Sequence, residues 1–122
     1  MTFQVKTSSF EMQTAGFGDI LDVTRQVAQG VSGSGLSDGT ATVFVPGSTA
    51  GITTIEYESG AVEDLKKAIE RQASVNLHYA HDARWGDGNG FSHVRAALMG
   101  ASLTVPFIRS ELQLGTWQQI VL

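Results

Sequence analysis

The chain has 122 residues, of which 42% are apolar, and its mean hydropathy is near zero, as expected for one globular domain and not for a disordered chain. Its net charge of −4 without a basic tract excludes nucleic acid as an expected partner, since phosphate backbones bind clustered Lys and Arg. It has no cysteine and no apolar run of the roughly 20 residues that cross a bilayer, which excludes disulfides, thiolate metal sites and a membrane partner and favours the cytoplasm.

Charged residues are scarce and unevenly placed. They make up 16% of the chain, against about 25% in typical soluble domains. Six of them fall within residues 63–71, and no Lys or Arg occurs between Arg25 and Lys66. Much of the remaining surface is therefore either neutral or not surface at all.

Period-two alternation of apolar residues predicts several strands. In residues 3–12, Phe3 and Val5 share one face, the pattern slips at Ser8–Ser9, and Phe10 and Met12 continue it, which is typical of a half-buried strand with a bulge. Further strands are predicted at residues 40–45, 52–57, 76–81 and 103–107. After a turn at Arg109–Ser110, Leu112, Leu114 and the final TWQQIVL (116–122) are predicted to complete a hairpin.

Apolar residues at three- and four-residue spacing predict two main helices and one short helix. Capping residues bound them at Asp19 and Gly30, at Ser59, and at Ser92 and Gly100. The second helix buries a stripe of Val62, Leu65 and Ile69 and carries the charge cluster on its outer face, with Glu63–Lys67 and Lys66–Glu70 at i,i+4 spacing. The order of elements indicates an α+β fold with a mostly antiparallel sheet, in one domain of residues 1–122.

The densest polar segment is residues 79–93, YAHDARWGDGNGFSH. It contains His81 and His93, which a loop can bring together with a carboxylate from Glu56, Asp82 or Asp87. Neutral imidazole and carboxylate ligands suit zinc and other divalent transition metals. The alternative interpretation is that both histidines are ordinary hydrogen-bonded loop residues.

Two loops are candidates for binding an anion. Residues 46–51 follow a predicted central strand and offer the hydroxyls of Ser48 and Thr49. The glycine-rich residues 86–90 include Asp87 and Asn89, and Arg84 and Arg95 flank this segment as candidate phosphate contacts. A tight turn is the alternative interpretation for each loop.

Three segments, PGSTAGITTIEYE (46–58), HDARWGDGNGFSHVRAALMGASLTVP (81–106) and LGTWQQIVL (114–122), resemble the YjbQ-like family over nearly the whole chain. The resemblance implies an α+β homotrimer with clefts between subunits and a histidine cluster that binds a metal. This chain has Gly47 and Phe91 where the family frequently has histidine, while Glu56, His81 and His93 match. Members of the family usually continue beyond the TWQQI strand with one more strand.

Family members are often described as secondary thiamine-phosphate synthases, which implies condensation of a pyrimidine diphosphate with a thiazole phosphate. Few cations are present for two phosphorylated substrates, so a different native substrate is expected. We therefore expect a trimeric, metal-assisted enzyme, using zinc or magnesium, that acts on a phosphorylated small molecule. His81 and His93 are the expected ligands, His81 is also a candidate general base, and Glu56 is their carboxylate partner. A non-catalytic metabolite-binding or structural trimer is the alternative.

Overall fold

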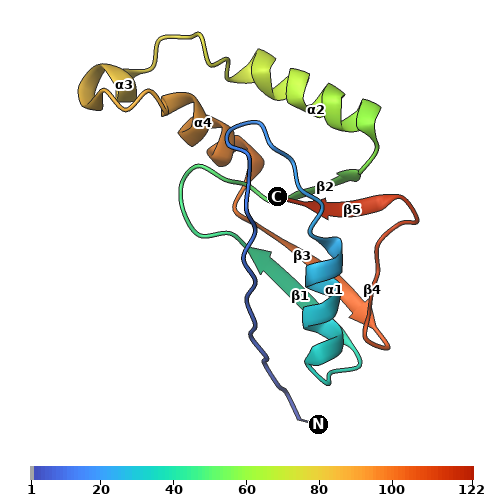
Figure 1. Ribbon diagram of the computed structural model, residues 1–122. Helices are drawn as coiled ribbons and strands as arrows, with labels where there is room; N and C mark the ends of the chain where they lie inside the picture. Colours follow the sequence, from blue (N-terminus) through green and yellow to red (C-terminus); the bar gives the residue numbers. More distant parts are fainter. Residues whose placement is uncertain (1) are drawn as a thin grey trace.

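The computed structural model describes residues 2–122, which form four helices and two small antiparallel sheets (Figure 1). Their order is α1 (Thr24–Gly33), β1 (Gly39–Phe44), β2 (Thr53–Glu56), α2 (Ser59–Gln72), α3 (Ala80–Trp85), α4 (Gly90–Met99), β3 (Ser102–Ile108), β4 (Glu111–Leu112) and β5 (Gln118–Val121). The predicted α+β class with antiparallel pairing is confirmed. Within the described residues, no helix has the length and apolar character needed to cross a membrane.

The larger sheet has the order β1–β3–β4, with Val43 of β1 opposite Leu103 of β3. The predicted turn at Arg109–Ser110 is confirmed, and both residues have positive φ angles of 52° and 63°, as a tight two-residue hairpin turn requires. The Ser110 amide donates a hydrogen bond of 2.7 Å to the Ser37 carbonyl, which holds this strained turn against the loop before β1.

The predicted hairpin is confirmed at its turn and at Leu112, which lies opposite Phe107, but it is wrong beyond that point, because β5 pairs with β2 in the second sheet. The other edge of β5 is also occupied, because the Val23 amide donates to the Ile120 carbonyl at 2.8 Å and Leu21 exchanges two hydrogen bonds with Leu122. The predicted helix start at Asp19 is wrong for the same reason. The chain before Thr24 pairs with β5, and this pairing postpones the start of α1, which then continues past Gly30.

The buried core is small and aliphatic. It joins α1, the loop before it, both sheets and the loop before β2, through Val23, Val27, Val43, Ile52, Val105 and Ile120. No polar or charged residue is buried among the described residues. The apolar stripe predicted for α2 is only half-buried, because α2 packs within this chain mainly on the narrow β2 edge (Figure 1).

The N-terminal segment is an extended arm and not the predicted strand at residues 3–12. Residues 2–14 have no strand partner among the described residues, and the arm runs past α1 and away from the body (Figure 1). Alternation of apolar residues is therefore not sufficient for a strand, which forms only where the backbone pairs with a neighbouring strand.

The predicted strand at residues 76–81 is wrong, because α3 begins at Ala80 and raises the number of helices from three to four. Gly86, with φ of 72°, ends this short helix in the left-handed region. Two predicted caps also differ by one to three residues. Glu58, not Ser59, is the N-cap of α2, and Asn89, not Ser92, is the N-cap of α4.

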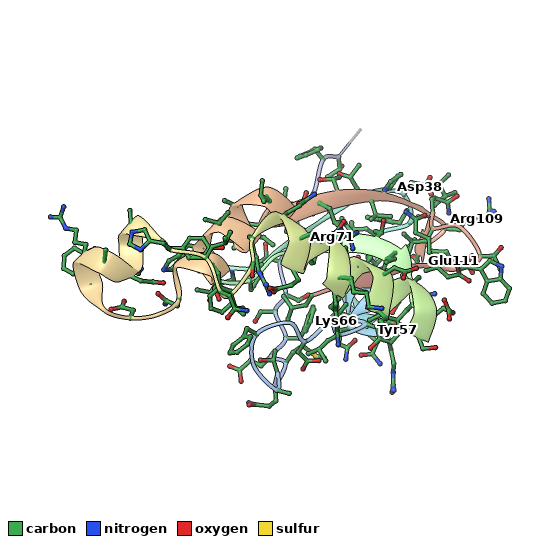
Figure 2. All side chains as sticks on the ribbon, turned by 90° about the horizontal axis from the view of Figure 1, so that it is seen from above. Asp38, Tyr57, Lys66, Arg71, Arg109 and Glu111 are labelled. Atoms are coloured by element: carbon green, nitrogen blue, oxygen red, sulfur yellow. The ribbon has the colours of Figure 1, made fainter. Side chains whose placement is uncertain are left out.

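The charged residues gather where the sequence predicts them. Lys67 and Glu63 form an exposed ion pair of 3.3 Å on α2. Viewed from above, the labelled charges lie on α2 and around the β3–β4 turn, away from the end of the molecule formed by α3 (Figure 2).

Candidate functional site

An open cavity of about 570 Å³ lies beside α4 and contains both candidate histidines. This size is in the range of small-molecule sites. Small side chains leave the space open, and the lining consists of Gly47, Ser48, Ala50, His81, His93, Ala96, Ala97, Gly100 and Ala101. A second cavity of about 380 Å³ between the two sheets has no acidic, basic or histidine side chain in its lining, so it offers less chemistry.

The α3–α4 pair positions His81. The Asp82 carboxylate accepts a hydrogen bond of 2.8 Å from the Gly90 amide, which ties α3 to the first residue of α4. A side chain at Gly90 would clash, since its Cβ would lie 2.7 Å from the Cβ of Tyr79. The same Asp82 oxygen lies 3.4 Å from Nδ1 of His81, so one carboxylate both joins the helices and faces the imidazole.

His93 lies in the first turn of α4 and is oriented by the loop after β1. Its Nδ1 lies 3.0 Å from the backbone carbonyl oxygen of Ser48. Because a carbonyl only accepts hydrogen bonds, Nδ1 carries the proton, and the Nε2 lone pair of the neutral ring is left for another partner. Metal-binding histidines are commonly held by this kind of contact.

The two imidazoles meet at the cavity, with ring centroids 4.5 Å apart and ring planes at 64°. They come from different helices, so the α3–α4 packing sets their distance. Within residues 2–122, no group of three or more acidic or histidine side chains is placed to surround an ion. The described residues therefore bring two imidazoles together at the cavity.

The other predicted anion contacts lie around the cavity and not inside it. Thr49 lies on the loop that also contains Ser48, but its side chain does not line the cavity. Asp87 is exposed, and Arg84 lies 5.2 Å from the ring centroid of Trp85. The side-chain oxygen of Asn89 is buried without a hydrogen-bond partner among the described residues, which leaves an acceptor at the start of α4.

Arg95 is already engaged by other groups. Its guanidinium donates a hydrogen bond of 2.5 Å to the Glu70 carboxylate and one of 2.9 Å to the Ala73 carbonyl. It also lies over the ring of Phe91. Hydrogen bonds from the Ser74 hydroxyl and then from Arg95 lower the pKa of Glu70, so this carboxylate is charged at neutral pH. The predicted contact between Lys66 and Glu70 is replaced by this α2–α4 ion pair. The phosphate role of Arg95 stays a prediction.

Glu56 lies at the end of β2 and is not part of the cavity lining, so this chain alone does not bring it to the histidines. Its catalytic role also stays a prediction. Sequence reasoning missed the alanines of the cavity. Their positions do form a pattern, since His93, Ala96, Ala97 and Gly100 follow i, i+3, i+4 and i+7 spacing and therefore share one face of α4.

The sequence profile of the UPF0047 protein YjbQ-like family matches residues 8–122. The chain belongs to this family. It is 36% identical over 117 residues to a UPF0047 protein from Methanothermobacter thermautotrophicus, covering 96% of this chain and 80% of that protein. It is 32% identical over 120 residues to the UPF0047 protein YugU from Bacillus subtilis, covering 98% of this chain and 83% of that protein.

Solved structures of UPF0047 relatives share the fold. A YjbQ-like protein of unknown function from Sulfolobus solfataricus matches with a TM-score of 0.83 at 32% identity, covering 89% of this chain and 78% of that one. An uncharacterized YjbQ/UPF0047 protein from Clostridium acetobutylicum matches with a TM-score of 0.80 at 33% identity, covering 89% of this chain and 83% of that one. The chain therefore shares both the family and the fold of these relatives.

Proposed function

We propose that the cavity between the loop after β1 and the α3–α4 pair is a metal-assisted catalytic site for a phosphorylated small molecule. One observation carries this proposal. His81 and His93 converge at 4.5 Å between ring centroids, and each Nδ1 faces an oxygen acceptor of its own. This arrangement is typical of metal-binding histidines, in which one ring nitrogen is held by an oxygen acceptor while the other is left for the ion.

Zinc fits the donor set better than magnesium, because imidazole nitrogens suit zinc and magnesium prefers oxygen ligands. His81 and His93 would hold the ion through Nε2. When bound, a divalent metal polarises a phosphoryl oxygen and acidifies a bound water. The chain's own residues orient the site, since the Ser48 carbonyl and the Asp82 carboxylate fix the two rings.

The test is zinc binding by the untagged protein. We expect His81→Ala and His93→Ala each to weaken zinc binding at least about tenfold, measured by metal analysis and calorimetry, since each removes one of two nitrogen donors. His78→Ala is the matched control, because His78 is an exposed histidine outside the cavity. Equal zinc affinity in wild type and both cavity variants would contradict the proposal.

Turnover is tested separately on phosphorylated small molecules, including the pyrimidine diphosphate and thiazole phosphate pair that the family resemblance implies. In the two cavity variants, we expect product formation to fall by about 100-fold or more, as for loss of a general base or metal ligand. Ligand-induced thermal stabilisation without turnover supports the alternative of a binding protein. A ligand at 100 times its Kd adds about 2.7 kcal/mol to the free energy of unfolding.

We also propose that the protein functions as a homotrimer. The described chain exposes 8307 Å², whereas a compact monomer of 13.0 kDa is expected to expose about 6,300 Å². The excess of about 2,000 Å² includes large apolar side chains such as Phe44, Trp85 and Leu98. Extended residues 2–14 contribute to this excess, and a neighbouring subunit would cover exposed apolar side chains elsewhere on the chain. A neighbouring subunit would also offer the third ligand that the described residues of one chain lack.

A further inference from the structure

The loop after β1, residues 46–51, is fixed at both of its ends to the end of α4 (Figure 1). The Val45 amide donates a hydrogen bond of 2.9 Å to the Ala101 carbonyl, and the Ile52 amide donates one of 2.9 Å to the Gly100 carbonyl. Gly100 and Ala101 both line the histidine cavity. The two hydrogen bonds therefore place the loop over the cavity and occupy the backbone acceptors of these two lining residues.

Two further contacts hold the middle of the loop. The Ser48 carbonyl oxygen lies 3.0 Å from Nδ1 of His93. Gly51 packs so closely on α4 that a Cβ built there would lie 2.7 Å from the Cβ of Met99. Contacts on α4 thus position the loop at its two ends and at two points between them.

The loop also has hydrogen-bond donors that no other described residue uses. The backbone amides of the five consecutive residues 47–51 donate to no described group, and neither do the hydroxyls of Ser48 and Thr49. Gly47, Ser48 and Ala50 line the cavity, and no acidic side chain does. A cavity that offers free donors and no carboxylate suits a ligand with several acceptor oxygens, such as an oxyanion.

The conformation of the loop does not suit pairing with a strand. A strand pairs along an extended backbone, whose amide and carbonyl groups alternate along one edge. This loop bends at residues 47–49, and the φ angle of Gly47 is +107°, in the left-handed region. A further strand, of this chain or of another, could not pair along such a loop. An anion, in contrast, accepts hydrogen bonds from neighbouring amides of a bent backbone.

We propose that the backbone amides of residues 47–51, together with the Ser48 hydroxyl, bind the phosphoryl group of a phosphate ester. Arg84 and Arg95 do not line the cavity, and Arg95 already donates to Glu70. Backbone amides bind phosphoryl oxygens without any cationic side chain, which agrees with a chain that has only eight Lys and Arg.

This inference deepens the proposed function and rests on it only in taking the ligand to be phosphorylated. With the phosphoryl group at the loop, the remainder of the ester lies along α4, where Ala96 and Ala97 offer no polar side chain. The substrate class is therefore a phosphate ester whose organic part is apolar on the side that faces α4.

Amide NMR with inorganic phosphate tests the loop directly. In zinc-free protein, we expect a phosphate titration to move the amide proton signals of residues 47–51 downfield and to saturate with a Kd of about 1 mM or tighter. Potassium chloride at equal ionic strength is the control and should leave these signals in place. Saturable shifts centred on the glycine-rich residues 86–90 instead, or no saturable shift, would overturn the inference.

A charge placed beside the loop tests the same site by calorimetry. We expect Ala50→Asp to weaken phosphate binding at least about tenfold, because its carboxylate repels the anion. Ala50→Asn has almost the same size without the charge and should bind phosphate about as well as the wild type. Gln29→Glu adds a charge on α1, outside the cavity, and should have no effect. No loss in Ala50→Asp, or an equal loss in Ala50→Asn, would contradict binding at the loop.

The two proposals fail separately. Because the phosphate titration contains no zinc, its failure would leave the zinc site of His81 and His93 standing. Equal zinc affinity in the histidine variants would likewise leave phosphate binding by the loop standing.

Discussion

At the scale of single residues, the candidate site depends on the atoms that orient two imidazole rings. The Ser48 carbonyl is a backbone group that a substitution does not remove, so its 3.0 Å contact with Nδ1 of His93 does not depend on the side chain at position 48. The Asp82 carboxylate serves His81 less directly, since its shorter hydrogen bond is to the Gly90 amide. Loss of Asp82 would therefore disturb the helix pair as well as the ring.

Gly47 offers a residue-scale test of metal binding. It lines the cavity, a Cβ built there meets no atom within 4 Å, and its φ is +107°. We expect Gly47→His to add a third nitrogen donor and to tighten zinc binding at least about tenfold, measured by calorimetry. Without zinc, the positive φ should lower the free energy of unfolding by about 1–3 kcal/mol.

Gly47→Ala separates the two effects. It introduces the same backbone strain without an imidazole, so it should match Gly47→His in metal-free stability and wild type in zinc affinity. If the histidine variant binds zinc no better than the alanine variant, the loop after β1 does not face the ion.

At the scale of elements, the N-terminus of α2 depends on one carboxylate. Glu58 accepts hydrogen bonds from the Gly60 amide at 2.6 Å and the Ala61 amide at 2.8 Å. These bonds favour the charged form and lower the pKa of Glu58 below its usual 4.5. Its stabilising contribution is therefore present above the usual pKa and is lost as the pH falls through the lowered value.

Accordingly, we expect Glu58→Gln to lower the melting temperature at pH 7 and the difference from wild type to vanish in acid, where both proteins carry an uncharged cap. Thermal unfolding across the pH range measures this. Asp64→Asn removes an exposed carboxylate from the same helix without touching the cap, and should show little of this pH dependence. A pH-independent effect of Glu58→Gln would show that hydrogen bonding by the neutral amide, and not charge, dominates the cap.

At the scale of the whole molecule, a small aliphatic core holds together a chain with an unusually large surface. Ile120 and Val23 are fully buried, while α2 has no buried residue and α3 projects at one end (Figure 1). The labelled charges of α2 and of the β3–β4 turn lie away from that end (Figure 2), where Arg84 and Asp87 are the exposed charged residues. Exposed large apolar side chains on α3 and α4, such as Trp85 and Leu98, are what a subunit interface would cover.

We therefore expect sedimentation or light scattering to give a molar mass that is a multiple of three chains at micromolar concentration. The melting temperature should rise with protein concentration, because association stabilises the folded chain by mass action. A single-chain mass would contradict the trimer without bearing on the zinc affinity of the histidines.

Local patterns in the sequence are sufficient to predict much of this fold. Alternation locates β1 and β3 with the turn after β3, helical spacing locates α2 and α4, and the motifs around His81 and His93 indicate the family. These features depend on side-chain periodicity and on turn chemistry within a few residues, and both are local properties of the sequence.

Tertiary structure decides which edges and side chains meet. β5 joins β2 and residues 21–23 instead of a hairpin partner, residues 80–85 become α3 because Asp82 and Gly90 connect two helices, and Arg95 turns to Glu70. Each of these contacts joins groups that periodicity does not relate. Their choice depends on the free energy of the whole packed chain, including the burial of Ile120 and the hydrogen bonds left to satisfy, so no local pattern contains it.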